Sequence, residues 1–138
     1  MKRITFVCTG NTCRSPMAAA LFAQYLKQKH ISGVEVHSAG IAANGAPAEP
    51  NAVAALAECG LDISGHVSTP LTAEHIKAGG VFVCMTPSHR AVLLQAGVPQ
   101  KNLFTLGIPD PYGGDLQVYR ACRDSISALL PELVNTVC

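Results

Sequence analysis

Four short apolar runs alternate along this chain with longer segments of helical pattern. The apolar runs lie at residues 3–8, 34–39, 80–85 and 102–106, and the helical segments at 15–30, 48–59, 72–78, 87–96 and 115–136. Such alternation predicts a parallel sheet with right-handed crossovers and helices on both faces. The continuous run Gly80-Val-Phe-Val-Cys-Met85 is typical of a strand covered on both sides. We therefore expect a three-layer α/β fold formed by one domain, residues 1–138.

The first apolar run leads into the octapeptide Cys8-Thr-Gly-Asn-Thr-Cys-Arg-Ser15, which Pro16 follows. A hydroxyl N-cap at Ser15 and a proline at the first helical position predict that a helix begins here. A loop between a strand and a helix N-terminus turns its N–H groups toward one point, where the helix dipole adds positive potential. We expect this loop to bind an oxyanion. Its residues are Thr9, Gly10, Asn11, Thr12 and Cys13.

Cys8 and Arg14 place a thiol and a guanidinium at the two ends of that loop. Arg14 would hold a bound phosphate as a bidentate fork, and Cys8 would attack it as a thiolate nucleophile. The positive potential of the loop favours the thiolate form. The sequence therefore predicts nucleophilic chemistry on a phosphorylated substrate.

Other interpretations of this loop fit the residues less well. The nucleotide-binding P-loop requires a lysine, and this loop has none; the dinucleotide fingerprint Gly-x-Gly-x-x-Gly is also absent. Cys8 and Cys13 have C-x4-C spacing, and no second Cys/His pair completes a metal tetrad. The residues thus indicate no metal site.

The segment from Val7 to Ala18 resembles the active-site signature of the low-molecular-weight protein tyrosine phosphatases. Three further segments resemble that family in the same order: Val36-His-Ser-Ala-Gly40, Gly65-His66 and Ile108-Pro-Asp-Pro-Tyr-Gly-Gly114. The resemblance covers essentially the whole chain. It implies a four-stranded parallel sheet and a protein phosphatase that works through a phosphocysteine intermediate. It implies no metal or organic cofactor.

Displacement from phosphorus by a thiolate needs a proton for the leaving group, and an acid that supplies it contributes about 10²–10⁴-fold. Asp110 is the best candidate, because Pro109 and Pro111 stiffen the loop around its carboxyl group. By itself a Pro-Asp-Pro segment is more often only a turn. The resemblance implies that Asp110 is the general acid, and that its carboxylate then activates water to hydrolyse the phosphocysteine. Asp115 is expected to be the N-cap of the last helix.

Supporting residues follow from the loop and from the resemblance. Asn11 tolerates the left-handed backbone that an anion-binding loop requires. The resemblance implies hydrogen bonds that link Asn11 to His66 and Ser15 to Ser38, and Ser15 could also donate to the Cys8 sulfur. Cys13 has two interpretations of equal weight: it packs the loop, or it forms a reversible disulfide with Cys8. Four other histidines show no metal spacing and are expected at the surface or partly packed; they are His30, His37, His75 and His89.

The substrate pocket is predicted from Thr12 and Tyr112. Tyrosine-specific members of the family usually carry isoleucine where this chain has Thr12, and a second aromatic residue where it has Gly113-Gly114. Many also place an acidic residue where it has Thr86. These differences resemble the bacterial protein-arginine phosphatase branch, so phosphoarginine in proteins is the expected substrate. A phosphotyrosine phosphatase is the nearest alternative.

Two more distant alternatives belong to other functional classes. A thiol-based arsenate reductase of this fold requires extra cysteines in a mobile segment near residues 80–92, where this chain has Cys84 alone, inside a predicted strand. A phosphate-sensing binding module would need neither a nucleophile nor an acid, yet Cys8 and Asp110 are both present. Both alternatives are therefore disfavoured.

Composition restricts the binding partners and the cellular location that we expect. Charged residues make up 14% of the chain and the formal net charge is +1, so neither a nucleic-acid surface nor a polybasic membrane contact is expected. No stretch approaches a membrane-spanning length, and the six cysteines without an export signal favour reduced thiols. We expect a soluble, cytoplasmic monomer or weak dimer that acts on phosphorylated proteins.

Overall fold

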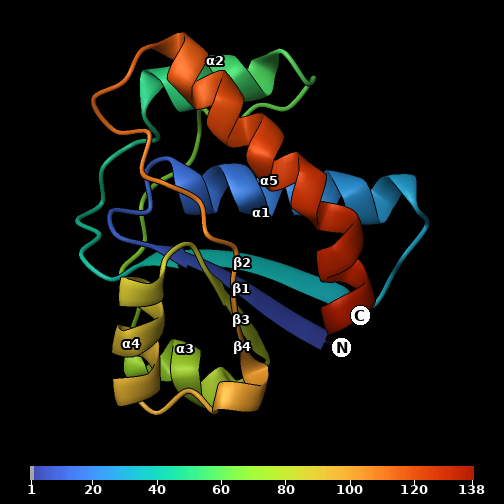
Figure 1. Cartoon of the computed structure of the whole chain (residues 1–138), viewed down its shortest axis with the longest axis vertical. Helices are drawn as coiled ribbons and strands as arrows, with labels where there is room; N and C mark the ends of the chain where they lie inside the picture. Colours follow the sequence, from blue (N-terminus) through green and yellow to red (C-terminus); the bar gives the residue numbers. More distant parts are fainter. Residues whose placement is uncertain (1) are drawn as a thin grey trace.

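Four parallel strands form one sheet in the order β2-β1-β3-β4, in a computed structural model that describes residues 2–138 (Figure 1). The strands are β1 (Lys2–Cys8), β2 (Val34–Gly40), β3 (Val81–Cys84) and β4 (Leu103–Thr105). The helices are α1 (Arg14–Gln28), α2 (Pro50–Ala57), α3 (Ala73–Ala78), α4 (Pro87–Gln95) and α5 (Leu116–Val137), and a 3₁₀ turn spans Gln100–Asn102. The predicted α/β class with a parallel sheet is confirmed.

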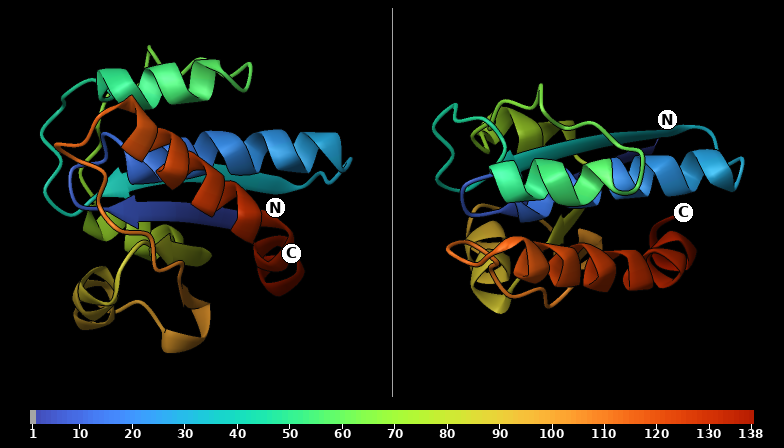
Figure 2. Two further views of the ribbon diagram at one scale, coloured as in Figure 1. Left: turned by 45° about the horizontal axis from the view of Figure 1, so that its top comes forward. Right: turned by 90° about the horizontal axis from the view of Figure 1, so that it is seen from above.

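Helices cover both faces of the sheet, as Figures 1 and 2 show. On one face, Ile4, Phe6 and Cys8 of β1 belong to a core that includes residues of α1, α2 and α5; the Phe6 and Phe22 rings meet edge-to-face at 5.5 Å. On the other face, Val7 packs in a smaller core with residues of β3, α4 and β4. The alternation of neighbouring β1 side chains between two apolar layers explains why the strand is apolar from Ile4 to Cys8, with Thr5 as the exception.

The predicted elements are all present, and their ends differ from the prediction by at most two residues. One detail was wrong: Ser15 is not the N-cap of α1. The helix begins at Arg14, its N-cap is Cys13 without a capping side chain, and Ser15 is its second residue. The reason is tertiary, because the Ser15 hydroxyl is bonded to Cys8 and Asn11 instead. The predicted N-cap of α5 is confirmed, since Val118 N donates to Asp115 Oδ1 at 3.1 Å.

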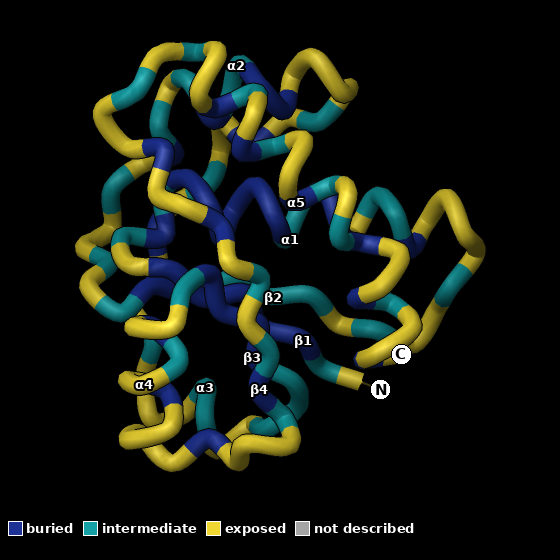
Figure 3. The backbone as a smooth tube through the Cα atoms, in the orientation of Figure 1, coloured by how far each residue is buried: buried dark blue, intermediate teal, exposed yellow. Residues whose placement is uncertain are grey.

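Three loops meet at the carboxyl edge of the sheet. Figure 2 shows the loop after β1, the loop after β2 and the segment that leads into α5 side by side there. Open parallel sheets bind their ligands at this edge. Figure 3 shows buried backbone running along β1 and into α1, so the loop after β1 rests on the most buried part of the fold. No helix within residues 2–138 combines the length and apolar character needed to cross a membrane.

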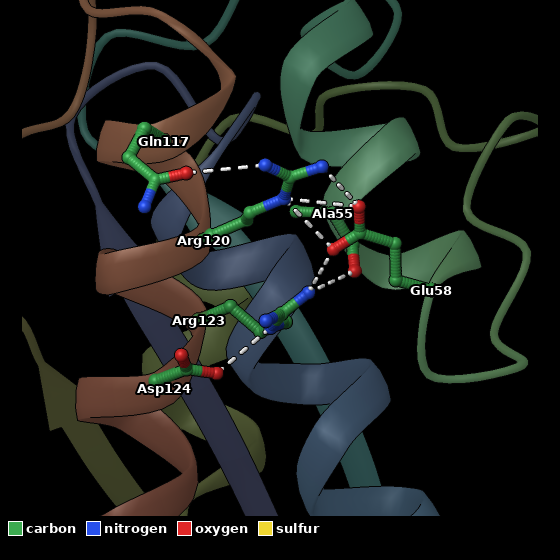
Figure 4. Close-up of polar contacts among 6 residues, drawn as sticks. All are labelled: Ala55, Glu58, Gln117, Arg120, Arg123 and Asp124. Atoms are coloured by element: carbon green, nitrogen blue, oxygen red, sulfur yellow. Dashed lines mark hydrogen bonds and ion pairs between the residues drawn. The ribbon is translucent and has the colours of Figure 1, made fainter.

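An ion-pair network joins α2 to α5 on the outside of the larger core (Figure 4). Glu58, which caps the end of α2, accepts from Arg120 at 2.7 Å and from Arg123 at 2.6 Å. Arg123 also donates to the Ala55 carbonyl at 2.9 Å. The hydrogen bonds from the two arginines lower the pKa of Glu58 from 4.5 to about 2.

This network predicts a pH dependence of stability. Because the pKa of Glu58 is lowered in the folded protein, the unfolded chain binds more protons between pH 4.5 and 2, and the free energy of unfolding falls as the pH falls through that window. We expect Glu58→Gln to lower the melting temperature at pH 6 and to flatten its decline below pH 4.5. Thermal melts of wild type, Glu58→Gln and the control Glu132→Gln, an exposed carboxylate of α5, test this. The same decline in Glu58→Gln as in wild type would contradict it.

Candidate active site

Cys8 is the last residue of β1, and its Sγ atom lies 2.9 Å from Ser15 Oγ in the first turn of α1. The Asn11 amide donates to the same Ser15 oxygen at 2.6 Å. Because an oxygen lone pair of Ser15 is occupied by that amide, its hydroxyl hydrogen is free to donate to the sulfur. A hydrogen bond of this kind stabilises a thiolate more than a thiol. The pair of contacts therefore directs the Ser15 hydroxyl at the Cys8 sulfur.

Asn11 adopts the left-handed conformation that was predicted, with φ of 56°, and is fully buried. Its main-chain carbonyl accepts a 2.7 Å bond from His66 Nε2, so the expected link between Asn11 and His66 is present. Its side-chain oxygen accepts from Thr69 N at 2.8 Å. These bonds hold a strained residue at the centre of the loop.

The expected hydrogen bond between Ser15 and Ser38 is not formed in residues 2–138. Strand register supplies the reason: Cys8, which Ser15 contacts, pairs with Gly40, whereas Ser38 pairs with Phe6 two residues earlier. Ser38 instead lines a hollow together with His66 and residues of α1.

The carbonyl groups of the loop after β1 are bonded away from the loop centre. Ile41 N and Ala42 N donate to the carbonyls of Cys8 and Thr9 at 3.0 and 2.8 Å, and Glu49 N donates to that of Thr12 at 2.9 Å. Over the described residues, the N–H groups of residues 9–13 donate no such bonds. Successive unpaired N–H groups of this kind form an anion-binding nest.

Gly40 lets β2 approach this loop closely. A Cβ atom at Gly40 would lie 2.7 Å from the Thr9 carbonyl oxygen and 2.8 Å from Asn11 Cβ. Any other residue would therefore push β2 away from the loop, which explains why glycine ends the strand.

Arg14 closes the nest from the helix side and is only 4% exposed. Its Nη1 donates to the Ile108 carbonyl at 3.0 Å, and its Nη2 lies 3.8 Å from Asp110 Oδ2. Its Nε is buried and has no partner among residues 2–138. A buried guanidinium N–H without a partner is costly, and an anion in the nest would satisfy it.

Asp110 lies on the segment between β4 and α5, and its side chain is 52% exposed. Backbone bonds from Leu106 N to Cys84 O and from Ile108 N to Met85 O anchor the start of that segment to β3. Tyr112 N donates to Asp110 Oδ1 at 3.0 Å. The carboxyl is thus held near Arg14 and is open to solvent.

A match to a family model decides the identity of this arrangement. Residues 3–138 match the model described as low molecular weight phosphotyrosine protein phosphatase. The chain belongs to this family.

Three relatives of the low molecular weight phosphatase family illustrate its range. A protein-arginine-phosphatase of Geobacillus stearothermophilus is 43% identical, over 96% of this chain and 94% of the relative. One solved structure is that of a YwlE arginine phosphatase mutant in which serine replaces cysteine and the active-site serine is phosphorylated. It is 38% identical in sequence, and the match covers 96% of this chain and 93% of the YwlE chain, with a TM-score of 0.89. An arsenate reductase of Bacillus cereus is 35% identical, over 98% of this chain and 96% of the relative.

The two residues expected to shape the phosphatase pocket come from two separate segments. Thr12 is half-buried in the loop after β1. Tyr112 lies two residues after Asp110, and 69% of the residue is exposed. Cys13 packs below the loop as a free thiol in the larger core, where burial raises its pKa.

His89 is a residue of this phosphatase site that the sequence analysis placed wrongly. It was expected at the surface or partly packed, yet it is only 6% exposed. Its ring lies 2.8 Å from Thr9 Oγ1, next to Cys8. The Thr-x-x-His spacing at Thr86 predicts an N-cap of α4, but the contact with Thr9 has no local sequence signal.

Proposed function

We propose that this chain is a cysteine-dependent protein phosphatase that acts as one domain, residues 1–138, on phosphoarginine in proteins. The observation that carries the proposal is the buried, unpartnered Nε of Arg14 beside a nest of unpaired N–H groups and the Cys8 sulfur. The proposal includes a cytoplasmic location and a monomeric or weakly dimeric state.

In the first step the phosphoryl group binds in the nest, where Arg14 donates to two of its oxygens. Cys8 Sγ attacks phosphorus, so that an S–P bond forms while the P–N bond to the substrate guanidinium breaks. Asp110 gives its proton to the departing nitrogen. The products of this step are an unmodified arginine side chain and a phosphocysteine.

In the second step the Asp110 carboxylate accepts a proton from water, whose oxygen attacks phosphorus. The S–P bond breaks, inorganic phosphate is released, and the sulfur leaves as a thiolate. The Ser15 hydroxyl, 2.9 Å from that sulfur, donates to it and stabilises the leaving thiolate. The phosphorylated active-site serine of the YwlE mutant supports an intermediate on the side chain at this position.

Phosphoarginine is favoured by the relatives and by the pocket. The relatives with 43% and 38% identity are named arginine phosphatases. Thr12 adds a hydroxyl to the phosphate-binding loop, where a polar guanidinium could be hydrogen-bonded, and Tyr112 is the one aromatic residue of the Asp110 segment. Arsenate reduction is disfavoured, because Cys84 is the one cysteine in residues 80–92 and is buried at the end of β3, where burial raises its pKa.

A comparison of two phosphopeptides tests the substrate. We expect wild type to prefer the phosphoarginine peptide, and Thr12→Ile to lower kcat/KM on it by about tenfold, roughly the value of one lost hydrogen bond, without lowering it for phosphotyrosine. Phosphate release from both peptides is the measurement, and Thr136→Ile on the exposed side of α5 is the matched control. A phosphotyrosine preference indifferent to Thr12 would assign the chain to the tyrosine phosphatases.

A further inference from the structure

Two helices of this protein begin with the same Thr-x-x-His arrangement. Thr72 and His75 start α3, and Thr86 and His89 start α4; in both, the threonine hydroxyl accepts from the histidine N–H at 3.4 Å. In α3 the two residues cap each other, because Thr72 N also donates to His75 Nδ1 at 3.0 Å. This pair of contacts is exposed. His75 therefore only caps a helix.

His89 does more than cap its helix. Its Nδ1 lies 3.0 Å from Thr86 Oγ1, and its other ring nitrogen, Nε2, lies 2.8 Å from Thr9 Oγ1. Thr86 Oγ1 accepts from the His89 N–H and also lies 3.1 Å from Ser88 Oγ. In one tautomer Nδ1 accepts from Thr86 and Nε2 donates to Thr9, and in the other Nδ1 donates and Nε2 accepts from the Thr9 hydroxyl. In both tautomers Nε2 is bonded to the Thr9 oxygen.

The charges around the ring agree with a neutral imidazole. Burial lowers the pKa of His89, and the nearby Arg14 guanidinium lowers it further, while Asp110 acts weakly in the opposite direction. At neutral pH the ring therefore carries one proton, so one ring nitrogen donates and the other accepts.

Thr9 follows Cys8 directly, and its side chain is exposed at the rim of the nest. Whether Nε2 donates to the Thr9 oxygen or accepts from its hydroxyl, that oxygen keeps a free lone pair for a substrate. We propose that His89 is a positioning residue of the phosphatase site, which holds the Thr9 hydroxyl in one orientation for substrate binding. This inference rests on the proposed function and adds a specificity contact to it.

Two conservative replacements separate the two ring nitrogens. An asparagine amide can occupy the place of Nδ1 and reach Thr86, whereas a glutamine amide can occupy the place of Nε2 and reach Thr9. We expect His89→Asn to raise KM for a phosphoarginine peptide about 3- to 10-fold, the range of one hydrogen bond, with kcat within about twofold. His89→Gln is expected to retain most of the affinity. His75→Asn, the same replacement at the corresponding cap of α3, is the control, and its KM and kcat are expected to equal those of wild type.

A double-mutant cycle and a spectrum complete the test. In a Thr9→Val background His89→Asn is expected to cause no further rise in KM, because the group on which it acts is gone. The ¹⁵N shifts of the His89 ring are expected to change in Thr9→Val, because Nε2 loses its partner there. Equal KM values for His89→Asn and wild type, additive effects in the cycle, or ring shifts that Thr9→Val leaves unchanged would each overturn the inference.

Failure of the proposed function would look different. Wild type would then release no phosphate from phosphoarginine, phosphotyrosine or an aryl phosphate, and the inference would fall with it. If wild type is active and only the His89 comparisons fail, the phosphatase assignment stands and His89 is a helix cap like His75.

Discussion

Replacing Cys8 with serine is expected to reduce phosphate turnover by about 10⁴-fold or more, because the hydroxyl is a far weaker nucleophile than the thiolate at this position. The nest and Arg14 are untouched, so inorganic phosphate should bind with an affinity within a few-fold of wild type. Steady-state phosphate release measures the first effect, and calorimetric titration with phosphate measures the second. The phosphorylated serine of the YwlE mutant suggests a further readout, namely a mass increase of Cys8→Ser after incubation with substrate.

Cys59→Ser is the matched control for this experiment. Cys59 is an exposed free thiol after α2, remote from the nest, so its replacement is expected to leave turnover unchanged. Full activity of Cys8→Ser would overturn the phosphocysteine mechanism. Loss of both turnover and phosphate binding would instead show that the loop no longer folds correctly in the variant, and a melting curve would detect that.

Replacing Asp110 with asparagine is expected to slow turnover by about 10²–10⁴-fold for substrates whose leaving group needs a proton. An asparagine amide cannot donate a proton to the leaving atom, although it preserves the size of the side chain. The loss should be smallest for an aryl phosphate with an acidic phenol, which leaves without protonation. Single-turnover rates over a series of aryl phosphates with increasingly basic phenols measure this gradient.

Asp124→Asn is the control that removes one negative charge elsewhere in the protein. Asp124 is an exposed carboxylate on α5 that pairs with Arg123 outside the site. We expect this variant to follow wild type across the series. An equal loss for every leaving group in Asp110→Asn would argue that Asp110 binds or orients substrate through Arg14 and is not the acid.

The elements that local sequence could specify were predicted well. β3 is a continuous apolar run, and β1 is apolar from Ile4 to Cys8 except at Thr5; each strand packs between two apolar layers, so the sequence pattern predicts a parallel sheet covered on both faces. The N-cap at Asp115 was also predictable, because the capping contact spans only three residues. The N-cap of α1 was not, because the Ser15 hydroxyl is bonded to Cys8 seven residues earlier instead of to its own helix.

For the site, the octapeptide determined by itself that a cysteine, an arginine and an N–H nest would share one loop, because all of them lie within eight consecutive residues. Only the tertiary structure decided what surrounds them. Ile108 supplies a carbonyl to Arg14 from 94 residues away, and His89 reaches Thr9 from 80 residues away. Contacts over such separations depend on strand order and register, which place the ends of β1, β3 and β4 at one edge. Local pattern describes which face a side chain takes along its own element, and it carries no information about the element that will lie opposite.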